Sequence, residues 1–148
     1  MSNGPTRPTD DILSAIHILA NLIGGAYSDH LDDIGITVPE WRVVLTLARY
    51  PGSTATEITD RWAMDKMAIS RAIQRQEKAN NIERKGNPDD RRSFRLSLTA
   101  SGDALYDKIL PVANKRYQTL VSSLSPRELA SLHKSLDKLI ADAGAMDI

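Results

Sequence analysis

The sequence predicts a mainly α-helical fold that carries one small β-hairpin. Three observations predict it. Helix-start signals recur along the 148 residues, apolar side chains follow most of them at helical spacing, and two strand-like segments flank one turn-rich stretch. Hydrophobic residues make up 41% and charged residues 26% of the chain, which is ordinary globular usage and excludes a disordered chain. At this length we expect a single domain, residues 1–148.

The composition excludes several classes of function. Cysteine is absent, so disulfides, thiolate nucleophiles, cysteine-zinc sites and thiol-based redox sensing are excluded. No apolar run approaches the roughly 18 residues that a membrane span needs. Residues 1–8 lack the apolar core of a signal peptide and are expected to form a flexible tail. We therefore expect a cytoplasmic protein.

The first half of the chain contains three helix starts. A first helix is expected to begin at Thr9 and to run to about Leu31, with an apolar stripe along it. A capping box with proline in the first turn, Thr37–Glu40, opens a second helix, which Pro51-Gly52 ends. A second capping box, Thr54–Glu57, opens a short third helix. Two short helices in a row therefore precede the most basic part of the chain.

A fourth helix is predicted from Asp65 to about Ala79, with one packed side and one free side. The side expected to pack contains Ile69, Ala72, Ile73 and Gln76. The free side carries Lys66, Ser70, Arg71, Gln74 and Arg75. Two short helices joined by a tight turn are typical of a helix-turn-helix protein, whose second helix fills the major groove. Arg pairs with guanine edges and Gln with adenine, while Lys neutralises phosphate.

A β-hairpin is predicted directly after this helix. Ile82–Lys85 and Arg92–Leu98 have strand character, and Phe94, Leu96 and Leu98 alternate on one side of the second strand. The stretch between them, Gly86–Asp90, is rich in turn-forming residues and is flanked by basic ones. A hairpin in this place is the wing of a winged helix-turn-helix, whose positive tip reaches phosphate or the neighbouring minor groove.

The charge distribution supports a polyanionic partner. The formal net charge of the chain is zero, but residues 61–95 contain ten basic and five acidic side chains, which leaves the remainder at −5. One basic segment on an acidic body is the asymmetry expected when a single region meets a nucleic acid. The alternative interpretation is a solvated helix face.

The C-terminal third predicts assembly. Thr99 caps a helix from Ala100 to about Ser123, and the capping box Ser125–Glu128, with Pro at the first helical position, opens a last helix. Four leucines recur in that helix at alternating spacings of three and four, a seam that requires a partner helix: Leu129, Leu132, Leu136 and Leu139. The partner is either another helix of the same chain or a second copy.

The wing stretch carries a specific resemblance. Asn87–Ser93, followed by Leu96–Gly102, resembles the wing signature of the MarR family, and the likeness extends over nearly the whole chain. The resemblance implies a homodimeric bacterial transcription regulator, with a winged helix-turn-helix lobe at 37–98 and dimerisation helices at 9–34 and 100–148. It also implies a repressor that leaves a near-palindromic operator when a small molecule, often a phenolic or aromatic carboxylate, binds.

Carried onto this sequence, the resemblance implies DNA contacts from the free side of the fourth helix and from Arg91 and Arg92 of the wing. Asp90 is expected to stiffen the tip by a charge-assisted bond to Arg92 or to a neighbouring helix arginine. The chain departs from the family pattern at Gln76, where an apolar residue is usual, and at Asn80-Asn81, which replace a glycine-apolar pair. Asn80 can adopt the left-handed conformation that closes a helix.

A non-covalent effector follows from the absence of cysteine. The resemblance to the MarR family implies a pocket between the DNA-binding lobe and the dimer helices, with His17, Trp41, Arg42 and Tyr117 as candidate lining residues. Arg42 would pair with an aromatic carboxylate while Trp41 stacks and His17 bonds a phenol. The alternative places Trp41 in the core and Arg42 in an intrachain ion pair.

No enzyme is predicted. The three histidines have no Glu or His partner at ligand spacing, and neither a phosphate loop nor a nucleophile elbow is present. The acidic group Asp29, His30, Asp32 and Asp33 is interpreted as solvated, so no metal and no cofactor are expected. Two alternatives to a DNA-binding regulator remain: a winged-helix protein-interaction module without specific DNA binding, and a small enzyme with an unrecognised site.

Overall fold

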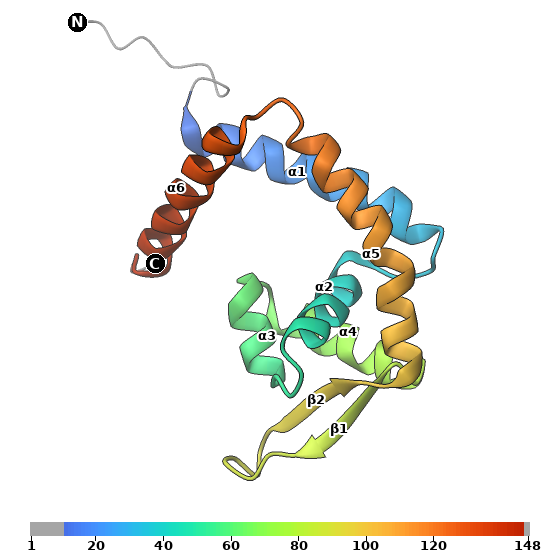
Figure 1. Cartoon of the computed structure of the whole chain (residues 1–148). Helices are drawn as coiled ribbons and strands as arrows, with labels where there is room; N and C mark the ends of the chain where they lie inside the picture. The colour runs from blue at the N-terminus through green and yellow to red at the C-terminus, as the bar shows by residue number, and fades with distance from the viewer. Residues whose placement is uncertain (1–10, 147–148) are drawn as a thin grey trace, which may run out of the picture. The chain divides into compact units, whose positions relative to one another are not determined.

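The computed structural model describes residues 11–146, and it confirms a mainly helical fold with one antiparallel hairpin (Figure 1). The elements are α1 (Ile12–Asp32), α2 (Val38–Arg49), α3 (Ala55–Trp62), α4 (Lys66–Lys78), β1 (Ile82–Gly86), β2 (Phe94–Leu98), α5 (Ala100–Leu120) and α6 (Pro126–Gly144). The chain forms two compact units, the first ending at Tyr106 and the second beginning at Asp107. The expected tail at residues 1–8 and the helix start at Thr9 lie outside the described residues. None of the described helices is both long and apolar enough to span a membrane.

The helix starts follow the predicted capping chemistry at most positions. Thr54 and Glu57 form a reciprocal capping box at α3, and Ser125 and Glu128 form another at α6. The Asp65 carboxylate accepts a hydrogen bond from the Ala68 backbone N–H at 3.0 Å and begins α4. Each cap satisfies a backbone donor that the first helical turn leaves without a partner.

Only one of the two hydrogen bonds of the predicted capping box of α2 forms. Thr37 caps the helix, and its hydroxyl accepts from the Glu40 backbone N–H at 3.4 Å. The Glu40 carboxylate does not return to Thr37, because it is buried and bonds side chains of α4 instead. This residue therefore belongs to tertiary packing, not to the helix start.

The core of the first unit joins α2, α3, α4 and both strands. Its buried members are Val43, Leu47, Ile58, Ile69, Ala72, Ile73, Ile82 and Leu96. The face of α4 predicted to pack is confirmed, since the buried residues of α4 are the four named from sequence. Burial of one face fixes the rotation of α4 about its axis, so the opposite face must point outward.

The hairpin is tied to the helical lobe through its second strand. β1 and β2 pair antiparallel with Ile82 opposite Leu98 and Gly86 opposite Phe94. The Gly52 N–H donates to the Leu96 carbonyl at 2.8 Å, and the Leu96 N–H donates to the Ser53 carbonyl at 3.0 Å. The α2–α3 loop thus pairs with β2 as a short third strand would, which fixes where the hairpin leaves the lobe.

Candidate nucleic-acid interface

The turn between α3 and α4 places the two helices as a compact pair (Figure 1). Ala63 ends α3 in the left-handed conformation with φ 48°, and the Met64 N–H donates to the Thr59 carbonyl at 3.2 Å. The Trp62 indole N–H donates to the Thr46 hydroxyl of α2 at 2.8 Å and anchors the end of α3. The three-residue connection 63–65 therefore sets the angle at which α4 leaves the turn.

The outward face of α4 carries the polar residues predicted to meet DNA. Lys66, Arg71, Gln74 and Arg75 are exposed, whereas Ser70 is half-buried. No hydrogen bond or ion pair within the described part of the chain engages the side chains of Arg71 and Gln74. Donors that the protein itself leaves free are available to base edges and phosphates.

Arg75 differs from its neighbours because it has a protein partner. Its guanidinium lies 3.4 Å from the Glu40 Oε1, and its side chain stays 65% exposed. Charge-assisted hydrogen bonds are usually about 2.7–2.9 Å long, so this contact is weak. It draws the guanidinium toward α2 while most of the arginine side chain stays exposed.

The two departures from the family pattern form one polar network beneath α4. Gln76 is buried, donates to the Glu40 carboxylate at 2.8 Å and accepts from the Asn81 amide at 2.9 Å. Asn81 in turn accepts from the Ser101 hydroxyl of α5 at 2.7 Å. Asn80 takes the expected left-handed conformation with φ 61°. The network replaces apolar packing and links α2, α4 and the start of α5.

The tip of the wing is a hydrogen-bonded turn that leaves its cations free. Asn87 donates from its amide to the Ser93 hydroxyl at 2.8 Å and accepts from the Asp89 N–H at 3.1 Å. The side chains of Arg91 and Arg92 are exposed. The second strand begins at Phe94, so Arg92 belongs to the turn and not to the strand predicted from sequence.

The side-chain pairing expected for Asp90 is found at Asp89 instead. Asp90 accepts from the backbone N–H of Arg92 at 2.9 Å and closes the turn, while the ion pair of the tip joins Asp89 to Arg95 at 2.9 Å. An Asx turn of this kind uses the carboxylate of the residue two positions earlier. Sequence reasoning missed Arg95 because its partner lies across the hairpin.

A second ion pair holds the stem of the wing against α4. Arg84 donates to Glu77 at 2.7 Å, and this bond raises the pKa of the Arg84 guanidinium above its ordinary value. The guanidinium also lies 5.2 Å from the centre of the Phe94 ring. Phe94 is 44% exposed, although strand alternation puts it on the same side of β2 as the buried Leu96. It serves as a cation–π platform on the surface.

The four residues predicted to line an effector pocket contact different parts of the protein, and no described cavity is lined by all of them. Trp41 is buried and stacks on Tyr106 with ring centroids 6.0 Å apart, as the core interpretation predicts. Arg42 lies 5.0 Å from the Trp62 ring centre and donates to the Met64 sulfur, not to the carboxylate of an ion pair. Burial lowers the pKa of Arg42. His17 is exposed on α1, and Tyr117 lies in the second unit, half-exposed.

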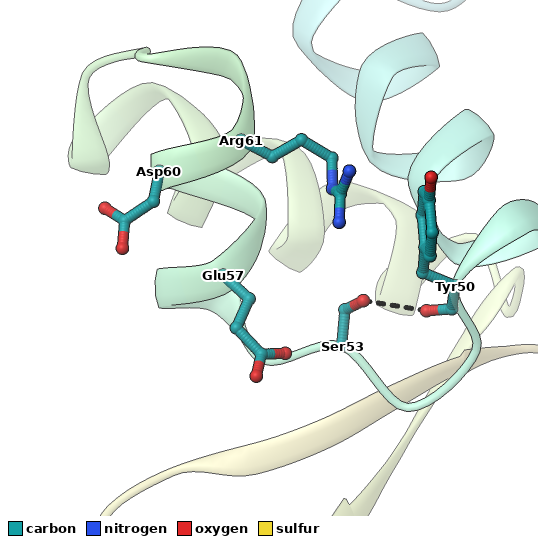
Figure 2. A pocket seen from close by; sticks show the side chains of 5 residues that line it. All are labelled: Tyr50, Ser53, Glu57, Asp60 and Arg61. Carbon is teal, nitrogen blue, oxygen red and sulfur yellow. Dashed lines mark hydrogen bonds between the residues drawn. The ribbon is translucent and has the colours of Figure 1, made fainter. Parts of the chain in front are cut away.

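Sequence reasoning missed an open hollow between the α2–α3 loop and α3. It measures about 720 Å³ and is lined by Tyr50, Ser53, Glu57, Asp60 and Arg61. Figure 2 shows the Arg61 guanidinium beside the Tyr50 ring, 3.9 Å from its centre, and two carboxylates on the other side of the hollow. These carboxylates disfavour phosphate, and none of the residues that line the hollow is among those predicted to contact DNA.

Comparison with known proteins identifies relatives that are similar to most of this chain. A family model described as MarR family matches residues 34–93. The multiple antibiotic resistance protein MarR of Escherichia coli (strain K12) is 25% identical over 142 residues, which covers 90% of this chain and 99% of that protein. The HTH-type transcriptional repressor MdtR of Bacillus subtilis (strain 168) is 26% identical over 80% of this chain and 77% of its own length.

Solved structures agree with the sequence relatives. A MarR/EmrR family transcriptional regulator from Acinetobacter sp. ADP1 superposes with a TM-score of 0.86 at 27% identity, covering 95% of this chain and 99% of that one. A MarR transcriptional regulator from Methanosarcina mazei Go1 superposes with a TM-score of 0.76 at 25% identity, over 89% of this chain and 95% of that one.

Proposed function

Because this chain belongs to the MarR family of winged helix-turn-helix transcriptional regulators, we propose that it is a homodimeric repressor released from its operator by a small ligand. Members of this family are DNA-binding transcriptional regulators and not enzymes, and this chain is one of them. The repressor role is suggested by relatives whose names describe them as repressors, MdtR among them.

The proposed DNA contact rests mainly on the outward face of α4. Its buried side is fixed by the core, and its free side presents Arg71, Gln74 and Arg75 at helical spacing. In this assignment α4 is the recognition helix, Lys66 and Ser70 contact the backbone or base edges, and Arg91 and Arg92 of the wing contact phosphate or the minor groove. Asp90 has a supporting role through the turn it closes.

Exposed apolar side chains support the dimer. On α1, Ile12 is 73% and Leu22 67% exposed, and on α6 the seam residues Leu132 and Leu139 are 43% and 45% exposed. Among the described residues α6 has no buried member. A helix with an apolar seam and no burial requires a partner, and we assign 9–34 and 100–148 to dimerisation around a DNA-binding lobe at 37–98. Two recognition helices about one turn of DNA apart would then read a two-fold operator.

The DNA assignment is tested by fluorescence anisotropy with DNA from the region upstream of the protein's own gene. The variant Arg71→Ala with Arg75→Ala should lose at least about tenfold in affinity, because each arginine contact to a base is worth roughly 1–3 kcal/mol. The matched control is Lys134→Ala with Lys138→Ala, which removes two exposed positive charges from α6. Wild-type affinity should fall steeply between two salt concentrations.

Equal affinity for the α4 double variant and the wild type would contradict the assignment of the recognition helix. Equal loss in the α6 control would show that net charge alone accounts for binding. Weak, salt-insensitive binding by every variant would favour the protein-interaction module. Circular dichroism of each variant establishes that folding is retained.

A further inference from the structure

A cleft of about 540 Å³ opens beside the recognition helix, between the α1–α2 turn, the end of α4 and the first turns of α5. Ile34, Ile36 and Leu105 form its apolar walls. Two polar side chains at its floor, Glu40 and Gln76, are only 4% and 3% exposed. The cleft therefore combines the volume of a small-molecule site with a buried ionisable group, a combination typical of ligand pockets.

The carboxylate at the floor of this cleft has unused acceptor capacity. Its Oε2 accepts the strong 2.8 Å bond from Gln76, whereas its Oε1 has only the 3.4 Å contact with Arg75. Each carboxylate oxygen can accept two hydrogen bonds. Because the Arg75 side chain is 65% exposed, solvent screens its attraction to Glu40 and makes this partner replaceable.

One acidic side chain and two helix C-termini add negative charge to the remainder of the cleft, against one basic side chain and the N-terminus of α2. Asp32 lies at its lip, and Arg75 is the one basic residue among those that line it. Two helices also end at the cleft, α1 at Asp32 and α4 at Lys78, with Gly35 and Ala79 of the following turns in its wall. Helix C-termini carry partial negative charge, which stabilises a nearby cation.

We propose that this cleft binds a small organic cation, an ammonium or amidinium group on an apolar body, with Glu40 as the anchoring carboxylate. The cationic group donates to Glu40 Oε1, and the apolar body lies against Ile34, Ile36 and Leu105. The ligand takes the place of Arg75 at the carboxylate and so changes the position of an arginine assigned to DNA. The effect on DNA rests on the proposed function, whereas binding in the cleft does not.

Three isosteric probes test the charge preference by isothermal titration calorimetry without DNA: benzamidine, the neutral benzamide and the anionic benzoate. Benzamidine should bind saturably to the wild type, and the other two should bind at least about tenfold more weakly. Glu40→Gln keeps the size of the side chain and an acceptor for Gln76 but removes the charge, and it should weaken benzamidine about tenfold or more. Asp60→Asn, which removes a carboxylate from the hollow of Figure 2, is the matched control and should bind as the wild type does.

Three outcomes would overturn the site: no saturable binding of benzamidine, tighter binding of benzoate than of benzamidine, or unchanged affinity in Glu40→Gln that folds normally. The coupling to DNA is tested separately by anisotropy in the presence of benzamidine. The probe should weaken DNA binding by the wild type and leave Glu40→Gln unaffected. Calorimetric binding without a change in DNA affinity would overturn the coupling, and absence of any DNA binding would count against the proposed function instead.

Discussion

Gln76 of α4 donates a 2.8 Å hydrogen bond to the buried Glu40 carboxylate of α2, 36 residues earlier in the chain. The sequence alone indicates a helix cap at Glu40 and, at Gln76, a polar residue where the family usually has an apolar one. Their bond explains both deviations at once. A buried charge requires hydrogen-bond partners, and Gln76 supplies the strongest one that Glu40 has.

Gln76→Leu restores the apolar residue usual in the family, yet it should destabilise the protein by about 1.5–3 kcal/mol, because a bond to a buried charge is lost. Urea denaturation measures the change. In the double variant Glu40→Leu with Gln76→Leu most of that loss should be recovered, since both polar groups are gone. A double-mutant cycle with no coupling between the two positions would contradict the network.

Gly102 in the first turn of α5 is required for a close approach. A Cβ at this position would collide with the Asn81 backbone carbonyl, which accepts from the Thr99 N–H. Gly102→Ala should therefore destabilise the protein by about 1–3 kcal/mol, as overpacking does. Gly24→Ala is the matched control. A Cβ there meets nothing within 4 Å, and thermal unfolding should show about 0.5–1 kcal/mol of added stability.

The capping box of α6 predicts a dependence of stability on pH. The Glu128 carboxylate accepts from the Ser125 N–H at 2.7 Å, which lowers the pKa of Glu128 below its ordinary value of 4.5. A group whose pKa is lower in the folded state stabilises the fold above the unfolded pKa. That contribution is lost as pH falls through the folded pKa.

Thermal unfolding followed by circular dichroism from about pH 6 to about pH 3 tests this dependence. Glu128→Gln should lose less stability on acidification than the wild type. Asp142→Asn removes an exposed carboxylate without a capping role in the same helix and should follow the wild-type curve. An identical acid response in Glu128→Gln and the wild type would show that the cap contributes nothing.

The apolar seam of α6 should be necessary for assembly. Leu132→Asp with Leu139→Asp places two charges in the seam and should shift the protein from dimer to monomer in sedimentation experiments, because burying an unpaired charge is costly. Ser131→Asp with Ala141→Asp adds the same charge on other faces of the helix and should leave the dimer intact. A wild-type protein that sediments as a monomer would refute the dimer directly.

Local signals predicted the helices and the wing well. Capping boxes at Thr54 and Ser125 fixed two helix starts, and the apolar spacing in α4 identified its buried face. Both rest on contacts between residues three or four positions apart, which a sequence displays directly. The buried residues of α4 determine which of its residues face outward. The candidate DNA contacts on α4 could therefore be predicted from the same apolar spacing.

Contacts between distant residues were not predictable in the same way. The Asp89–Arg95 pair depends on the register of the hairpin, and the Glu40–Gln76 bond on how α2 crosses α4. Nothing in the local sequence distinguishes a capping glutamate from a buried one. Trp41 and Arg42 are neighbours in sequence, but they lie on different sides of α2 and have different aromatic partners.

In the proposed assignment, α4 reads base edges while the wing contacts the DNA backbone. Selection of bound sequences from a randomised DNA pool, performed with the wild type, Arg71→Ala and Arg91→Ala, tests it most directly. Arg71→Ala should relax the preferred base at two symmetric positions, whereas Arg91→Ala should keep the wild-type preference and reduce the salt dependence of binding by about one charge. An unchanged preference in Arg71→Ala, or a wild type that selects no sequence, would show that α4 does not read base edges.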